Sequence, residues 1–361
     1  MDPINILITA VGTQSMPGLA NCFHYNNERQ IRLIGADMSN DQTICQMVDV
    51  LYQVPRVTDS SYIDSLLDIC EKEKIDIFFP FMDEELELVL DKIDEFNTRG
   101  VKVAIASREA IEITNNKLKF YDFLKENDIY VPEYFKANNV DEIEYACQQL
   151  GYPEKSVCVK TLDGSGSRGI RILDAKTDLY ELFISEKPNT MFTTKEAFLE
   201  MLKGKENIKE MMVMEYLPGA ECSVDILAKN GEILYMVGRE SNNVLASIPQ
   251  DCELKVIPKA YEICEKITNL LKLDGNADFD FKYDNNGNPV LMEINPRLAA
   301  TLSVIAVGGV NLPYLRVKQL LGEDLPEIKP KYGVKLKRRY LDMFIDKEGN
   351  RLDWSNYETR N

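Results

Sequence analysis

The first hundred residues alternate between short apolar runs and amphipathic segments, and this alternation constrains the fold more than any other feature. Short apolar runs predict strands, and apolar residues at a helical period predict the helices between them. Strands that alternate with helices form a parallel, doubly wound sheet. The predicted strands are at residues 4–9, 32–37, 76–81 and 101–107, and the predicted helices at 16–25, 62–75 and 85–96.

From residue 115 onward the pattern changes, and strands outnumber helices. Two helices come first, one of which begins after Asn115 or Asn116, because asparagine caps helix N-termini. Residues 174–211 are charged and irregular and read as an insertion. The predicted helices span 115–130 and 141–153, and the predicted strands span 156–160, 169–173, 211–217, 222–228, 232–238, 277–283, 289–295 and 334–345. The basic residues of the last strand read as a solvated face.

Composition excludes several classes of function. A formal charge of −17 argues against a general binder of nucleic acid or anionic membranes, which needs a basic surface. The single histidine, His24, and eight scattered cysteines argue against a histidine triad or a thiolate zinc site, so a bound metal is expected to have oxygen ligands. The chain lacks an apolar run of about 18 residues and a basic leader, which leads us to expect a cytoplasmic protein.

A glycine-rich loop joins the strands predicted at 156–160 and 169–173. Gly164, Ser165, Gly166 and Ser167 begin a run that matches the spacing of the dinucleotide-binding fingerprint, but that fingerprint requires a helix after the glycines. A strand follows here instead. Two interpretations stay open: a plain hairpin loop, or a loop whose N–H groups bind phosphate oxygens.

Two lysines bear on that choice. Lys160 ends an apolar strand, where a cation is costly without an anion, and therefore favours phosphate binding. Lys117 begins the helix predicted at 115–130, and taken alone it reads as a solvated surface lysine.

The segment 214–221, MEYLPGAE, is predicted to be a strand followed by a bend and an acid. The exposed main-chain N–H and C=O groups at such a bend can form hydrogen bonds with the edge of a purine, and Glu221 can then accept hydrogen bonds from ribose. A strand end with surface acids is the alternative interpretation.

The strands predicted at 277–283 and 289–295 form a hairpin that brings acidic residues together. Asp280 and Glu293 occupy positions that can share one face, and Asn295 follows Glu293 on the same side of its strand. Facing carboxylates repel each other unless a cation lies between them. Two carboxylates and an amide oxygen suit Mg²⁺, so this hairpin predicts a metal site.

Together, and in this order, these segments resemble the ATP-grasp superfamily, in particular the carbamoyl-phosphate synthetase large subunit, biotin carboxylase and the pyrrolysine-biosynthesis ligase. The resemblance covers most of the chain and implies an ATP-grasp fold, α+β in its ATP-binding part, behind a Rossmann-like pre-ATP-grasp domain. The domains that it implies span residues 1–113, 114–185 (the lid), 186–325 and 326–361.

The resemblance also implies roles for individual residues. Lys117, Lys160 and the glycine loop would bind phosphates, Glu215, Tyr216 and Leu217 would face adenine, and Glu221 would hold ribose. Asp280, Glu293 and Asn295 would hold Mg²⁺ or Mn²⁺, Arg297 would stabilise the charge that develops in phosphoryl transfer, and Lys160 would assist it. Arg239 would lie near the substrate, in an acceptor pocket built from Gly12–Met16, Asp83–Glu85 and 239–253.

The implied activity is that of an ADP-forming carboxylate–amine ligase that acts through an acyl phosphate on a small carboxylate such as an amino acid. Its partners would be these small molecules, and a homodimer is an assembly that it allows. Two alternatives stay open: a phosphotransferase like carbamoyl-phosphate synthase, and a nucleotide-binding protein without turnover. The chain departs from the pattern at Asp280, where relatives commonly have Glu or Gln, and at residues 298–301, LAAT.

Overall fold

The computed structural model describes residues 2–41, 43–162, 168–186, 190–205, 207–245, 248–339, 341–348 and 350–352. The chain divides into two compact units, each built from segments that are distant in the sequence. The first unit comprises Met1–Asn115, Cys222–Asp280 and Ile294–Asn361, and the second comprises Asn116–Glu221 and Phe281–Glu293.

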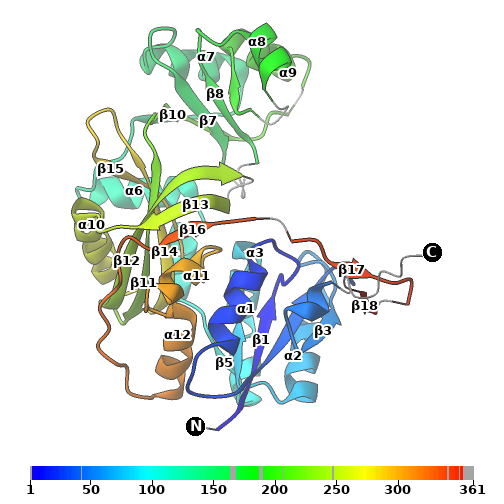
Figure 1. Cartoon of the computed structure of the whole chain (residues 1–361). Coiled ribbons are helices and arrows are strands. Elements are labelled where there is room, and N and C mark those ends of the chain that lie inside the picture. The colour runs from blue at the N-terminus through cyan, green and yellow to red at the C-terminus, as the bar shows by residue number, and fades with distance from the viewer. Residues whose placement is uncertain are drawn as a thin grey trace, which may run out of the picture. The chain divides into compact units, whose positions relative to one another are not determined.

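The N-terminal part of the first unit contains a parallel sheet with the strand order β3-β2-β1-β4-β5, which confirms the predicted fold class (Figure 1). Its strands are β1 (Ile4–Thr9), β2 (Ile31–Asp37), β3 (Val50–Gln53), β4 (Ile77–Phe79) and β5 (Lys102–Val103). Its helices are α1 (Met16–His24), η1 (Ile44–Gln46), α2 (Tyr62–Glu73), α3 (Asp83–Asp91), α4 (Ile93–Thr98) and α5 (Arg108–Thr114). Strand β3 and helix α5 were missed by the sequence patterns, and the helix predicted at 85–96 is two helices that meet at Lys92.

Alternation along the strands of this sheet buries apolar side chains on both faces. Ile6 and Ile8 of β1 pack with α1 on one face, while Leu7 packs with α2 on the other. Helix α1 also contacts α11 (Leu302–Val307) and α12 (Leu312–Leu321), so the parallel sheet and the C-terminal segment share one core.

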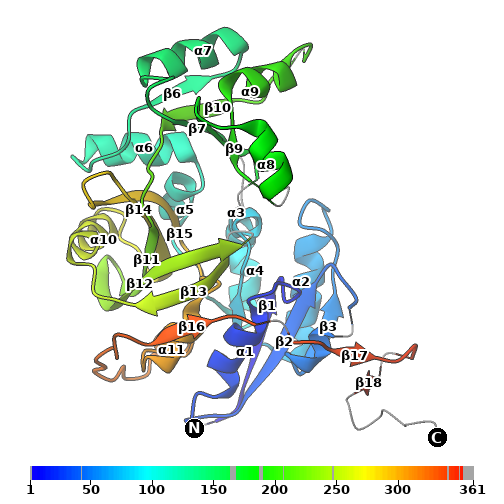
Figure 2. The ribbon, with the colours of Figure 1, turned by 45° about the horizontal axis from the view of Figure 1, so that its top comes forward.

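The first unit also contains most of an antiparallel sheet, with the order β15-β14-β11-β12-β13-β16 (Figure 2). Its strands are β11 (Glu221–Lys229), β12 (Glu232–Leu245), β13 (Ile248–Leu254), β14 (Gly275–Tyr283), β15 (Pro289–Asn295) and β16 (Lys335–Lys337). Helix α10 (Pro258–Leu270) contacts β12, where the Tyr261 hydroxyl accepts a hydrogen bond from the N–H of Gly238 at 2.8 Å. Leu227, Val237 and Leu254 belong to the same core as α11 and α12.

The prediction of one strand over residues 334–345 is wrong for most of its length. Among the described residues of that range, the strands are β16 and the two-residue β17 (Phe344–Ile345), which pairs with β18 (Arg351–Leu352). The basic residues are not all a solvated face either. Lys335 and Lys337 are exposed, but Arg338 is half-buried and donates hydrogen bonds to the carbonyls of Pro249 and Ala300 at 2.9 and 3.0 Å.

The second unit is built on a five-stranded sheet with the order β6-β10-β7-β8-β9. Its elements are α6 (Lys117–Glu126), β6 (Tyr134–Ala137), α7 (Val140–Gln149), β7 (Val157–Thr161), β8 (Ile170–Leu173), α8 (Leu179–Ser185), β9 (Phe192–Thr193), α9 (Lys195–Leu202) and β10 (Met211–Glu215). Strand β9 pairs with β8, so part of the irregular segment 174–211 completes this sheet. Helices α7 and α9 cover one face, where Val157 and Val159 point (Figure 2). Lys160 alternates with Val157 and Val159 along β7, and its side chain contacts Tyr121 of helix α6.

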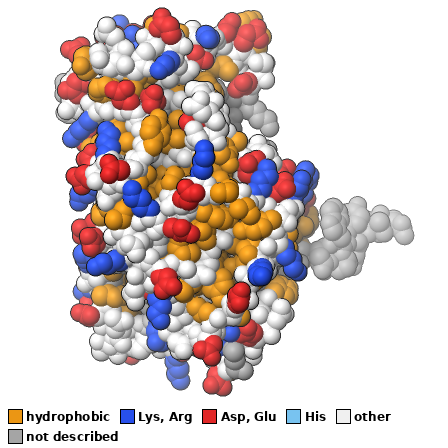
Figure 3. All heavy atoms as spheres, turned by 90° about the vertical axis from the view of Figure 1, so that its left-hand side faces the viewer, with side chains coloured by type: hydrophobic (Ala, Val, Ile, Leu, Met, Phe, Trp, Pro, Cys, Tyr) orange, Lys and Arg blue, Asp and Glu red, His pale blue; other side chains and the backbone are white. Residues whose placement is uncertain are grey.

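The surface carries charges of both signs. On the face drawn in Figure 3, acidic and basic side chains are interspersed, and apolar side chains gather toward the middle. Within the described ranges, no helix is both long and apolar enough to cross a membrane.

Candidate active site

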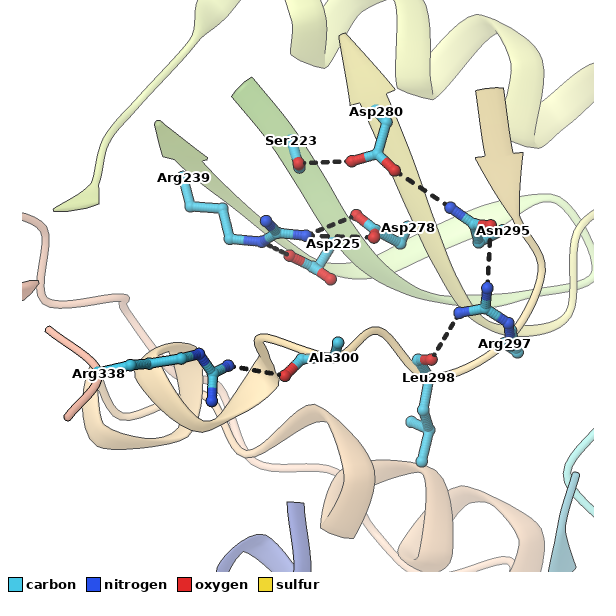
Figure 4. Close-up of polar contacts among 10 residues, drawn as sticks. All are labelled: Ser223, Asp225, Arg239, Asp278, Asp280, Asn295, Arg297, Leu298, Ala300 and Arg338. Atoms are coloured by element: carbon cyan, nitrogen blue, oxygen red, sulfur yellow. Dashed lines mark hydrogen bonds and ion pairs between the residues drawn. The ribbon is translucent and has the colours of Figure 1, made fainter. Parts of the chain in front are cut away.

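A row of polar side chains crosses β11, β14 and β15, the three adjacent strands at one edge of the antiparallel sheet (Figure 4). Asp280 accepts a hydrogen bond from the Ser223 hydroxyl at 2.6 Å and another from the side-chain amide of Asn295 at 3.2 Å. The structure therefore brings together two of the three predicted metal ligands. Ser223 was not among the predicted residues.

Arg297 follows β15 directly and continues this row. Its Nε and Nη2 donate to the two carboxylate oxygens of Asp83, at 2.7 and 2.6 Å. Nη2 also donates to Asn295 Oδ1 at 3.1 Å, and Nη1 donates to the Leu298 carbonyl at 3.1 Å. Hydrogen bonds thus connect Ser223, Asp280, Asn295, Arg297 and Asp83 without a break.

Glu293 completes the predicted set of metal ligands. Glu293 is exposed and lies two residues before Asn295 on β15, so strand alternation puts both side chains on one face. Among the residues that the structure describes, no group of three or more His, Cys, Asp and Glu side chains is placed to hold a metal ion. The predicted set contains only two carboxylates, with an amide as the third oxygen donor, and this chemistry fits Mg²⁺.

Arg239, which was predicted to lie near the substrate, is buried within the antiparallel sheet (Figure 4). Its Nε donates to Asp225 at 2.8 Å, and its Nη2 donates to both oxygens of Asp278 at 3.0 and 3.1 Å. Burial works to lower the pKa of Arg239, but the two carboxylates raise it overall. Burial, together with the charges of Asp280 and Asp225, raises the pKa of Asp278 well above its ordinary value. The described contacts of Arg239 are therefore ion pairs inside the protein, and its role toward a substrate stays a prediction.

In the second unit, the side chain of Lys160 is buried near the end of β7. Its Nζ lies 3.3 Å from the Tyr121 hydroxyl and 5.0 Å from the centre of that ring. Within the described part of the chain, no carboxylate forms an ion pair with Lys160. Burial lowers the pKa of Lys160, although the charges of Cys158 and Glu293 oppose this. A buried ammonium without a carboxylate partner is an arrangement that a bound anion would stabilise.

Lys117 contacts the residue at the end of the described segment that precedes the glycine-rich loop in the sequence. Asn116 caps α6 by accepting a hydrogen bond from the N–H of Lys119, and Lys117 Nζ donates to the Leu162 carbonyl at 3.1 Å. Lys117 is therefore not simply a solvated surface lysine. Residues Gly164, Ser165, Gly166 and Ser167 lie outside the described residues.

Strands β7 and β8 form the hairpin that the glycine-rich loop was predicted to join. The N–H of Thr161 donates to the Gly169 carbonyl at 3.0 Å, which closes the base of the loop. Gly169 has φ +72°, and a Cβ there would lie 2.3 Å from the Thr161 hydroxyl. Only glycine fits this position.

The segment predicted to contact adenine ends β10. The Glu215 carboxylate accepts a hydrogen bond from the Glu133 N–H at 3.0 Å. The Glu215 N–H donates a second one to the Glu133 carbonyl, also at 3.0 Å. The Tyr216 ring is half-buried and lies edge-on to Phe192. Leu217 is buried and Glu221 is exposed. The roles of these four residues toward a nucleotide stay predictions.

Two family models match the chain. Residues 6–104 match a model described as "PylC-like, N-terminal domain", and residues 207–339 match one described as "ATP-grasp in the biosynthetic pathway with Ter operon". The chain therefore contains an ATP-grasp domain and a PylC-like N-terminal domain, as the sequence motifs predicted.

Known proteins agree with this assignment. The carbamoyl phosphate synthase large chain of Clostridium acetobutylicum is 26% identical over 291 residues, which cover 78% of this chain and 25% of that protein. The chain thus spans about a quarter of the length of the first such relatives that it matches.

Two solved structures show the same fold. The biotin carboxylase of Campylobacter jejuni in complex with β,γ-ATP has a TM-score of 0.65 at 17% identity, over 91% of this chain and 73% of that one. The L-amino acid ligase of Bacillus licheniformis has a TM-score of 0.58 at 14% identity, over 88% of this chain and 74% of that one.

Proposed function

We propose that the chain is an ADP-forming carboxylate–amine ligase that uses Mg²⁺-ATP. The observation that supports this most strongly is the row of hydrogen bonds from Asp280 through Asn295 to Arg297, because it joins predicted oxygen ligands for a metal to a guanidinium. Phosphoryl transfer is catalysed mainly by positioning and by charge neutralisation, and these residues supply both.

In this proposal the nucleotide is held by residues of the second unit. Lys160 and Lys117 bind phosphate oxygens, and the anion offsets the cost of burying the Lys160 ammonium. Glu215, Tyr216 and Leu217 face adenine, and Glu221 accepts hydrogen bonds from ribose. The biotin carboxylase of C. jejuni, which shares this fold, is described as a complex with β,γ-ATP, and this supports a nucleotide site in the proposal.

Asp280, Glu293 and Asn295 hold Mg²⁺, which would neutralise phosphate charge when bound. A carboxylate oxygen of the substrate attacks the γ-phosphorus and ADP leaves, which gives an acyl phosphate. An amine nitrogen then attacks the acyl carbon, loses a proton, and expels inorganic phosphate. Arg297 stabilises the negative charge that develops on the transferred group and on the tetrahedral oxygen.

The substrates in this proposal are a small carboxylate, such as an amino acid, and an amine. The shared fold with an L-amino acid ligase makes amino acids the first class to examine. The test is release of ADP and inorganic phosphate when pairs of amino acids are supplied with Mg²⁺-ATP. A stable phosphorylated product without free phosphate would indicate a phosphotransferase instead, and ATP binding without turnover on any pair would indicate a nucleotide-binding protein.

The matched variant for this test is Arg297→Ala. We expect it to retain affinity for Mg²⁺-ATP and to lower kcat by about 100- to 1,000-fold, as loss of a transition-state donor does elsewhere. Unchanged turnover would show that Arg297 does not have the role proposed here.

A further inference from the structure

Asp83 makes the most extensive contact with Arg297, and neither the sequence motifs nor the comparisons assign it a role toward this arginine. Its two carboxylate oxygens accept two hydrogen bonds from the guanidinium, at 2.7 and 2.6 Å. Two parallel hydrogen bonds between a planar guanidinium and a planar carboxylate fix the orientation of both groups. A single hydrogen bond would leave the guanidinium free to rotate.

The other two acceptors described for the Arg297 guanidinium lie close to it in the sequence. Asn295 and Leu298 lie within two residues and accept hydrogen bonds at 3.1 Å each. Asp83 is separated from Arg297 by 214 positions in the sequence. Asp83 is therefore the described contact that ties the orientation of Arg297 to the parallel-sheet domain.

Asp83 itself is held in place by the start of α3. Its carbonyl accepts a hydrogen bond from the Asn115 side chain at 3.3 Å. Two residues later, Glu85 is fully buried and accepts hydrogen bonds from the Thr9 and Tyr62 hydroxyls, both at 2.5 Å. Glu85 also accepts hydrogen bonds from the N–H groups of Phe81 and Met82 at 2.7 and 2.9 Å. The first turn of α3 is thus anchored to the carboxyl ends of β1 and β4.

An ordinary structural salt bridge is the alternative explanation for this pair. The Arg297 and Asp83 side chains are 17% and 28% exposed, so their charges are partly solvated and add little to stability by themselves. The anchoring of Asp83 by Glu85 and Asn115 instead fixes where the guanidinium points, and that orientation matters for Arg297 if Arg297 contacts the reacting group.

We propose that Asp83 is a positioning residue, which acts through Arg297 by holding its guanidinium in the orientation that catalysis requires. This inference rests on the proposed function of Arg297. Displacement of a catalytic group by about 1 Å costs about 100-fold in rate, and loss of one carboxylate oxygen of Asp83 permits such a displacement.

The test compares Asp83→Asn with Glu87→Gln. Glu87 is an exposed acid on the same helix, so its variant makes the same change in charge away from Arg297. We expect Asp83→Asn to lower kcat by about 100-fold with less than about a threefold change in KM for ATP, whereas Glu87→Gln behaves as wild type. Asp83→Glu keeps the carboxylate and should recover part of the lost kcat.

A double variant tests whether Asp83 acts through Arg297. In an Arg297→Lys background the bidentate contact is already lost, so Asp83→Asn should lower kcat by no more than about twofold further. A full additional 100-fold loss, or a kcat for Asp83→Asn equal to that of Glu87→Gln, would overturn the proposal.

A second readout does not depend on turnover. Phenylglyoxal modifies arginine, and mass spectrometry of the Arg297 peptide reports the rate at that side chain alone. Asp83→Asn should raise this rate several-fold over wild type and over Glu87→Gln, because the carboxylate no longer holds the guanidinium. If wild type releases no ADP with any substrate pair, the proposed function fails, while this labelling still decides whether Asp83 holds Arg297. An unchanged labelling rate would contradict that.

Discussion

Lys160 is the residue whose surroundings make the clearest prediction. It ends an apolar strand, its described hydrogen-bond partner is the Tyr121 hydroxyl, and burial lowers its pKa below the ordinary value of 10.5. The sequence alone indicated an anion at this position, because a lysine at the end of a buried strand needs compensation. The structure adds that no described carboxylate lies within ion-pair distance of Lys160, although the charge of Glu293 acts on it.

This environment predicts how nucleotide affinity depends on pH. A bound phosphate favours the charged ammonium, so the complex holds the Lys160 proton more tightly than the free protein does. Affinity for Mg²⁺-ATP should therefore be highest below the lowered pKa of Lys160 and fall as pH rises through it, by up to about tenfold per pH unit.

The measurement is the Kd for Mg²⁺-ATP as the pH is raised toward the ordinary lysine pKa of 10.5, in wild type and in Lys160→Met. The variant should bind more weakly throughout and show no such decline, since it has no ammonium to titrate. It should unfold at no lower temperature than wild type, because it removes a buried charge. The same decline with pH in both proteins would exclude Lys160 as its source.

At the scale of single elements, the sequence predicted the long periodic segments well and the short ones poorly. Strands β1, β2 and β4 and helices α1, α2, α6 and α7 lie where the patterns placed them. Strand β3 was missed because its residues, VLYQ, are only partly buried and show no clear alternation. Strand β13 was missed because IPQDCEL contains a proline and three polar residues, and its pairing with β12 and β16 is a long-range property.

The same reason limited the prediction of the site. Asp280 and Asn295 belong to one predicted hairpin, so sequence spacing could bring them together. Asp83 was named only as part of an acceptor pocket, since no local pattern links it to Arg297. A carboxylate at the start of a helix that follows a buried strand of a parallel sheet is the signal that could have drawn attention to it.

Helix α3 provides a test of how the site is supported. Glu85 accepts four hydrogen bonds in a fully buried position, where burial raises its pKa and these hydrogen bonds oppose the rise. Glu85→Ala would remove the acceptor of the Thr9 and Tyr62 hydroxyls and of the Met82 N–H, while the Phe81 N–H would keep its hydrogen bond to the Thr9 hydroxyl. We expect the free energy of unfolding to fall by about 3–5 kcal/mol.

Urea unfolding measures this change, and Glu87→Ala is the matched control. Glu87 is exposed on the same helix, so its removal should change the free energy of unfolding by less than about 0.5 kcal/mol. Equal effects of the two variants would show that the Glu85 hydrogen bonds do not anchor α3.

For the whole molecule, the main property is that each compact unit combines segments that are distant in sequence. The first unit joins the parallel-sheet domain to most of the antiparallel sheet through one core, in which α1 packs with α11 and α12. A periodic sequence pattern can predict a single element, but it carries no information on such packing between distant segments.

If nucleotide and metal bind as proposed, they should stabilise the whole chain. A ligand that binds only the folded state adds about 2.7 kcal/mol at a concentration of about 100 times its Kd. We expect Mg²⁺-ATP to raise the Tm and ATP with EDTA to raise it much less, because without the metal the carboxylates of Asp280 and Glu293 would repel the phosphates. Equal Tm values with and without EDTA would contradict the metal assignment.

The most direct test of the central claim follows oxygen from the carboxylate to phosphate. An amino acid that supports ADP release is supplied with ¹⁸O in its carboxyl group, together with Mg²⁺-ATP and the amine, and the inorganic phosphate is examined by ³¹P NMR. An acyl phosphate transfers one carboxylate oxygen to the phosphate, so the account predicts phosphate that carries a single ¹⁸O. Phosphate without label, or AMP and pyrophosphate as the products, would contradict it.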